Sequence, residues 1–114
     1  MTIWCIMATP KNSPPNTVTH YILDQNGSPK PETDLLKWSD WIVRTNLCIA
    51  DDHVGNSLVH TEFLGVGITR RSPLWETTVH GGRLDKVTAR CGGNREQAQA
   101  MHANILRRVR GGYD

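Results

Sequence analysis

The chain has 114 residues, of which 38% are hydrophobic and 21% are charged, and its formal net charge is +2. This composition excludes a disordered chain and predicts a single folded domain over residues 1–114. No stretch approaches the ~18 consecutive apolar residues of a membrane span, and the apolar run Ile3–Ala8 lacks the basic flank of a signal peptide, so we expect a cytosolic protein without a membrane partner.

The first half of the sequence predicts three strands and one helix. The strands are Ile3–Ala8, Thr17–Asp24 and the shorter Asn46–Ala50, and the first two are rich in β-branched and aromatic residues. Asn26 and Gly27 predict a turn after the second strand because both tolerate positive φ. Thr33 or Asp34 is expected to cap a helix that runs to about residue 44. The apolar positions of this helix are Leu35, Trp38, Trp41 and Ile42.

The second half predicts three more strands. After a polar turn at Asp51–His53, these strands are Ser57–Val66, Pro73–His80 and Lys86–Cys91. Side chains alternate between the two faces of a strand. One face of Ser57–Val66 therefore carries Val59, Thr61 and Phe63, and the other carries Leu58, His60, Glu62 and Leu64.

A second helix is predicted from Asn94 to the Gly111-Gly112 pair. Asn94 is a good N-cap, and Gln97 stands three residues later, as in a capping box. Ala98, Met101, Ile105 and Val109 form its core stripe. Because short connections join neighbouring strands, we predict an α+β fold with a mostly antiparallel sheet of five or six strands and two helices packed on one face.

Histidines and carboxylates on neighbouring strands form one candidate site. If Ser57–Val66 pairs with Pro73–His80, their polar faces could bring together His60, Glu62, Glu76 and His80. Imidazole and carboxylate groups are ligands for divalent metals and partners in acid–base chemistry. The alternative is a polar ladder that faces solvent.

The cysteines Cys5, Cys48 and Cys91 are far apart and form no CxxC pair, so neither a disulfide framework nor a zinc knuckle is indicated. Cys91 precedes a helix N-terminus, where free amides can lower a thiol pKa, and His80 or His102 could act as its base. An ordinary buried cysteine is the alternative. No catalytic residue is therefore assigned.

The same helix start carries glycines and basic residues that suit an anion. The candidate phosphate or nucleotide site is Arg90, Gly92, Gly93, Asn94 and Arg95. Glycines let a ligand approach the backbone, and free helix amides favour negative charge. The Lys-Ser/Thr ending of a Walker loop is absent. The alternative is a helix cap after a tight turn.

Charge is distributed unevenly along the chain. Residues 1–64 have four Lys and Arg against seven Asp and Glu, whereas residues 65–114 have nine against four. Such asymmetry suggests a face that steers a charged partner, unless the two halves interleave in space. The candidate contact surfaces are an acidic set, Asp24, Glu32, Asp34 and Asp40, and a basic set, Arg70, Arg71, Arg107, Arg108 and Arg110.

Several short blocks between residues 20 and 109 occur in an order that resembles a known set of proteins. The blocks are Tyr21–Asp24 with Asn26-Gly27, Asp34-Leu35 with Trp38 and Trp41, Thr61–Gly65, Pro73–Thr77 with Val79, Gly81-Gly82 and Asp85, and Arg90 with Glu96–Ala98 and His102. This pattern is similar to small uncharacterised proteins of tailed phages and prophages. That set has no established activity, so the resemblance implies only an accessory protein made in the bacterial cytoplasm.

We therefore expect a protein that acts by binding, without a cofactor. Its expected partner is a host protein or protein–nucleic acid complex, such as a defence complex that it inhibits. One alternative is a protein that binds or hydrolyses a nucleotide-like anion at Gly92–Arg95, and another is a structural protein of the virion. A homodimer is a further candidate assembly.

Overall fold

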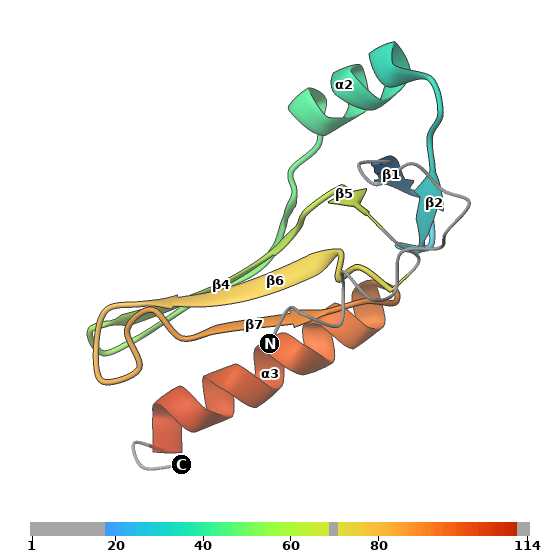
Figure 1. Cartoon of the computed structure of the whole chain (residues 1–114). Coiled ribbons are helices and arrows are strands. Elements are labelled where there is room, and N and C mark those ends of the chain that lie inside the picture. The colour runs from blue at the N-terminus through green and yellow to red at the C-terminus, as the bar shows by residue number, and fades with distance from the viewer. Residues whose placement is uncertain (1–17, 69–70, 112–114) are drawn as a thin grey trace.

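The structure is a computed structural model that describes residues 18–68 and 71–111. The predicted strand Ile3–Ala8 lies outside the described residues. Figure 1 shows an elongated molecule with extents of 46 × 33 × 20 Å. Its elements are β1 (Thr19–Leu23), β2 (Pro29–Pro31), α2 (Leu35–Arg44), β3 (Cys48–Val54), β4 (Ser57–Phe63), β5 (Val66–Gly67), β6 (Trp75–His80), β7 (Thr88–Cys91) and α3 (Arg95–Gly111).

The strands form two antiparallel sheets and not one. A three-stranded sheet has the order β2-β1-β5, and a four-stranded sheet has the order β3-β4-β6-β7. The α+β class is thus confirmed, whereas a single sheet of five or six strands is wrong. The predicted strand Ser57–Val66 breaks after Phe63, and Gly65 has a φ of +80°. This left-handed backbone, which glycine adopts without strain, redirects the chain into β5 and the second sheet.

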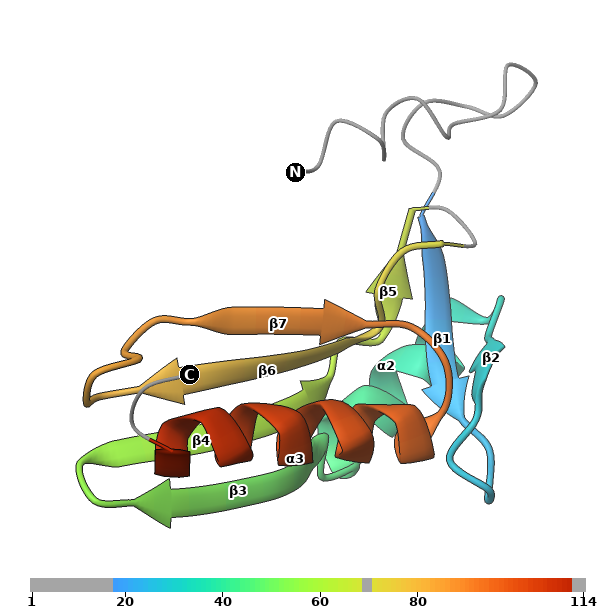
Figure 2. The same ribbon diagram turned by 90° about the horizontal axis from the view of Figure 1, so that it is seen from below.

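Each helix packs on a different sheet, so the prediction of two helices on one face is also wrong. Helix α3 contacts all four strands of the larger sheet, and Figure 2 shows it lying across one face of that sheet. Helix α2 lies on the smaller sheet, where it contacts β1, and its Trp41 ring meets Phe63 of β4 edge-on, with ring centroids 5.9 Å apart. Within residues 18–68 and 71–111, no helix is long and apolar enough to cross a membrane.

The core lies between α3 and the four-stranded sheet. One buried cluster contains Val59, Val79, Ile105 and Leu106, and the other contains Phe63, Leu74, Trp75 and Ala98. The predicted alternation of Ser57–Val66 is confirmed, since Val59, Thr61 and Phe63 are at most 1% exposed. The ring centroids of Phe63 and Trp75 lie 4.8 Å apart. This core fixes α3 against the sheet and leaves the opposite sheet face without a helix from the described residues.

Local signals set the helix ends as predicted. The Asp34 side chain accepts from the backbone amides of Leu36 and Lys37 and so caps α2. At α3, Asn94 Oδ1 accepts from the Gln97 amide at 3.1 Å and Gln97 Oε1 accepts from the Asn94 amide at 2.9 Å, which confirms the capping box.

Candidate functional site

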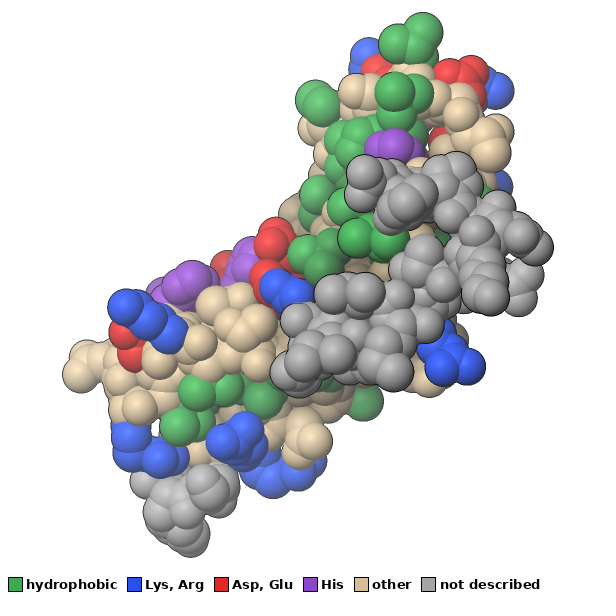
Figure 3. Space-filling view, in the orientation of Figure 1, with side chains coloured by type: hydrophobic (Ala, Val, Ile, Leu, Met, Phe, Trp, Pro, Cys, Tyr) green, Lys and Arg blue, Asp and Glu red, His purple; other side chains and the backbone are tan. Residues whose placement is uncertain are grey.

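The face of the four-stranded sheet that points away from α3 carries polar side chains, and we call it the open face. In β4, residues of buried and intermediate exposure alternate along the strand. His60 and Glu62 lie on the open face, while Thr61 and Phe63 point toward α3. Histidine and carboxylate side chains gather over this part of the sheet in Figure 3.

An irregularity in β3 adds two more ligand-type side chains to the open face. Cys48 pairs with Glu62, and Asp51 pairs with His60, although Cys48 and Asp51 are three positions apart. In a regular strand, residues three apart point to opposite faces. The register shifts by one residue between Cys48 and Ala50, as in a β-bulge, and this shift places Cys48 and Asp51 on the same face. The expected turn at Asp51–His53 is therefore wrong, because these residues continue β3.

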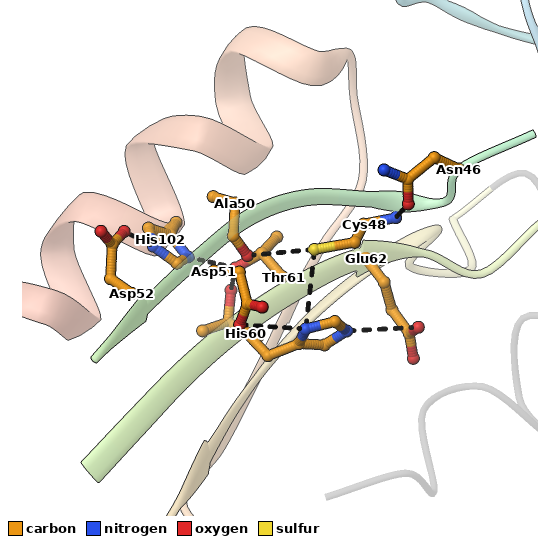
Figure 4. Close-up of polar contacts among 10 residues, drawn as sticks. Asn46, Cys48, Ala50, Asp51, Asp52, His60, Thr61, Glu62 and His102 are labelled. Carbon is orange, nitrogen blue, oxygen red and sulfur yellow. Dashed lines mark hydrogen bonds and ion pairs between the residues drawn. The ribbon is translucent and has the colours of Figure 1, made fainter.

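The ring of His60 is the centre of this cluster (Figure 4). Its Nδ1 atom lies 3.6 Å from Cys48 Sγ and 3.5 Å from Asp51 Oδ1. Its Nε2 atom lies 3.5 Å from Glu62 Oε1. The pKa of the Cys48 thiol is raised, mainly because the thiol is partly buried. The negative charges of Asp51 and Glu62 raise this pKa further, whereas the hydrogen bond from Sγ to the Ala50 carbonyl lowers it. One ligand atom each from Cys48, Asp51 and His60 lies within 4.8 Å of the others.

The structure brings three of the four predicted histidine and carboxylate residues together and leaves His80 apart. Glu62 pairs with Glu76 on the open face next to His60, whereas His80 pairs with Leu58 at the other end of the strand pair. The Arg90 Nε atom donates to Glu76 at 2.8 Å, so an ion pair already holds that carboxylate. His60 and Glu62 remain together at one end of this set. Neither Cys48 nor Asp51 is predicted from the sequence, because Asp51 is expected in a turn and Cys48 reaches this face only through the register shift.

A second polar group lies between the sheet and α3. The Nδ1 atom of His102 is 2.7 Å from the Thr61 hydroxyl, and its Nε2 atom is 2.8 Å from Asp52 Oδ2. Because a carboxylate oxygen only accepts, Nε2 donates to Asp52, and in a neutral imidazole of this tautomer Nδ1 accepts from the Thr61 hydroxyl. Thr61 in turn accepts from Thr77. Thr61 is 0% exposed and Thr77 1%, so these two hydroxyls serve the core, whereas the Asp52 side chain at the other end of this chain of hydrogen bonds is 47% exposed.

The cysteine interpretation at the start of α3 has no support from the geometry. Burial raises the pKa of the Cys91 thiol, the opposite of what a reactive thiolate needs. Cys91 packs against the buried cluster of Trp75 and Phe63. His102 is hydrogen-bonded to Thr61 and Asp52, so it is not placed as a base for Cys91.

The predicted anion site is partly filled by the protein itself. The amide of Arg95 donates to the Gly27 carbonyl, the amide of Gln97 donates to Asn94, and the Gly93 carbonyl accepts from Trp75 Nε1. Arg90 is paired with Glu76. Around the helix start there is a shallow polar hollow lined by Asn26, Asn94, Arg95, Glu96 and Gln99. Anion binding there stays a prediction.

Each member of the acidic set makes a local contact. Asp24 accepts from the amides of Asn26 and Ser28, and these bonds, that of Ser28 first, lower the pKa of its carboxyl. Glu32 accepts from the Asp34 amide, and Asp40 Oδ1 accepts from Arg44 Nε at 2.6 Å. With Asp34 capping α2, these carboxylates stabilise turns and helix ends.

The basic set lies mainly on the last turns of α3. Arg107 and Arg110 are exposed and Arg108 is half-buried. Arg107 donates to Asn104, and among the described residues no carboxylate forms an ion pair with these three arginines. Arg70 lies outside the described residues. Arg71 already interacts with another group of the protein.

Large apolar side chains are exposed on α2, on β5 and beside β1 and β5, and we call this set the α2 surface. It consists of exposed side chains of α2, of β5 and of the residues next to β1 and β5: Val18, Leu35, Leu36, Val43, Val66 and Ile68. Leu36 is 83% exposed and Val43 80% exposed. No residue of α2 is buried, although Trp38 Nε1 anchors the helix by donating to the carbonyls of Tyr21 and Gly65. Figure 3 shows apolar side chains gathered at this end of the molecule.

No protein-family model, curated protein or solved structure matches this chain. The resemblance to phage proteins therefore stays a prediction, and functional conclusions depend on the geometry described above.

Proposed function

We propose that this protein acts by binding another protein through the α2 surface. The observation that carries the proposal is the exposure of large apolar side chains on a short helix, with Leu36 and Val43 at least 80% exposed. Large apolar side chains left in water are costly, and where they gather they typically mark an interaction site.

The charges around the α2 surface favour a protein partner over a nucleic acid or a membrane. Helix α2 carries Lys37 and Arg44 as well as Asp40, and Asp34 caps it. An apolar centre with a polar rim of both signs is typical of protein–protein interfaces. A nucleic-acid surface would be predominantly basic, and a helix that lies on a membrane would have a polar face rich in Lys and Arg.

The partner that we propose is a host protein of the bacterial cytoplasm, such as a component of a defence complex that this protein inhibits. The support for the host is the resemblance of several sequence blocks to phage proteins. The support for inhibition is steric. A small domain that binds an apolar groove on its partner prevents other molecules from binding there.

The test uses a double variant that keeps α2 helical but makes its exposed side polar at Leu36 and Val43. Leu36→Glu adds a negative charge in the first turn and Val43→Lys adds a positive charge in the last turn, and both charges suit the helix dipole. We expect this variant to fold normally and to bind a purified partner, identified by capture from host lysate, at least about tenfold more weakly by calorimetry.

The matched control is Arg107→Glu with Arg110→Glu, which reverses charge on exposed residues of α3. We expect this control to retain affinity. The proposal fails if the arginine variant loses binding while the α2 variant keeps it. It also fails if light scattering shows that the wild type forms dimers that the α2 variant cannot form, since the α2 surface would then join two copies of this chain.

A further inference from the structure

We propose that Cys48, Asp51 and His60 form a binding site for a divalent ion of the zinc class, and that Glu62 positions the His60 ring for it. The site lies on the open face of the four-stranded sheet, and the α2 surface belongs to the other end of the molecule. This inference is therefore independent of the proposed function. It also differs from the set predicted from the sequence, because Cys48 and Asp51 take the places of Glu76 and His80.

Two of the three donor-atom distances match tetrahedral coordination, and the donor atoms of Cys48 and Asp51 lie within 4.8 Å of each other. With metal–ligand distances of 2.0–2.3 Å, neighbouring donor atoms in a tetrahedral zinc site are about 3.3–3.6 Å apart. His60 Nδ1 is 3.6 Å from Cys48 Sγ and 3.5 Å from Asp51 Oδ1. Only a small rotation of side chains would be needed to close the three donors around one ion.

The donor types decide the class of ion. Thiolate and imidazole ligands suit zinc and cobalt, whereas magnesium and calcium prefer oxygen ligands. Three protein ligands leave a fourth coordination position free. The side chain of Asp51 is 52% exposed and that of His60 28% exposed, so water can reach that position.

Glu62 lies where a carboxylate can orient a metal-binding histidine without contacting the ion itself. Metal-binding histidines commonly donate the N–H of the second ring nitrogen to a carboxylate, which fixes the tautomer and the ring orientation. Glu62 Oε1 lies 3.5 Å from His60 Nε2, on the side of the ring away from Cys48 and Asp51. If Glu62 accepts a hydrogen bond from Nε2 when the ion is bound, the Nδ1 lone pair is available for the ion.

The register shift in β3 supplies a second, independent argument. The shift breaks the regular ladder, and its consequence is that Cys48 joins Asp51 and His60 on one face. Bulges are enriched next to functional sites, where they redirect a side chain. Without the register shift in β3, the Cys48 thiol and the Asp51 carboxylate, three positions apart, would point to opposite faces of the sheet.

A titration of the full chain with Co²⁺ under reducing conditions tests the proposal. We expect thiolate-to-cobalt charge-transfer absorption that saturates at one ion per chain, is displaced by Zn²⁺ and is unaffected by Mg²⁺. Cys48→Ser should abolish this absorption, and His60→Ala should weaken binding at least about tenfold. Glu62→Gln should weaken it by about 10–100-fold, because the ring loses its orienting partner.

Two matched controls use the same residue types outside the cluster. Cys91→Ser and His80→Ala should leave the absorption and the affinity unchanged, and circular dichroism verifies that every variant is folded. In the wild type, Zn²⁺ should shift the Nδ1 resonance of the His60 ring more than the Nε2 resonance, which tests the site without any substitution. The proposal is overturned if the wild type gives no thiolate absorption, if Cys91→Ser removes it, or if Nε2 is the shifted nitrogen.

Discussion

Replacing Trp75 with alanine is expected to lower the free energy of unfolding by about 3–5 kcal/mol. Trp75 is 0% exposed, it packs against Phe63, and its Nε1 atom donates to the Gly93 carbonyl at 2.8 Å. Its removal would leave a cavity in the core and would release the segment that leads into α3. Chemical denaturation followed by circular dichroism would measure the change.

Trp75→Phe is the control for this prediction. It keeps an aromatic ring against Phe63 but loses the hydrogen bond to Gly93. We expect a loss of about 1–2 kcal/mol, smaller than that of the alanine variant. Equal stability of the alanine variant and the wild type would contradict the packing of α3 on this sheet.

The second large effect is expected at the buried hydroxyl of Thr61. Thr61→Val keeps the shape of the side chain but leaves Thr77 without its acceptor and His102 Nδ1 without its donor. Since each buried polar group that loses its partner costs about 1–3 kcal/mol, we expect the two groups together to cost about 2–6 kcal/mol. Thermal and denaturant unfolding would measure it.

A double-mutant cycle tests whether the two threonines act as a pair. In Thr77→Val, Thr61 can still donate to His102, so this variant should lose less stability than Thr61→Val. The double valine variant should lose less than the sum of the single variants, because it removes both hydroxyls together. Additive losses would show that Thr61 and Thr77 do not interact in solution.

Several features set by neighbouring residues in the chain are predicted correctly from the sequence, although the turn expected at Asp51–His53 is not. Asp34 and Asn94 cap the two helices because each side chain reaches amides two or three positions away. The alternation of Val59, Thr61 and Phe63 predicts the buried face of β4 because side-chain direction in a strand depends only on position.

Features set by distant pairing are not predictable in this way. The break at Gly65 sends β5 to pair with β1, and the sequence around it reads as one continuous strand. Asp52 meets His102 from a position fifty residues away. The grouping of Cys48 with His60 depends on a register shift between two strands, and no spacing within either strand reveals it.

Hydrogen exchange on the complex with the purified partner tests the central claim, binding through the α2 surface, most directly. The account predicts that binding slows exchange in α2 and β5 and leaves α3 and the β4–β6 pair unchanged. Protection concentrated on the last turns of α3, around Arg107 and Arg110, with α2 unaffected, would contradict it.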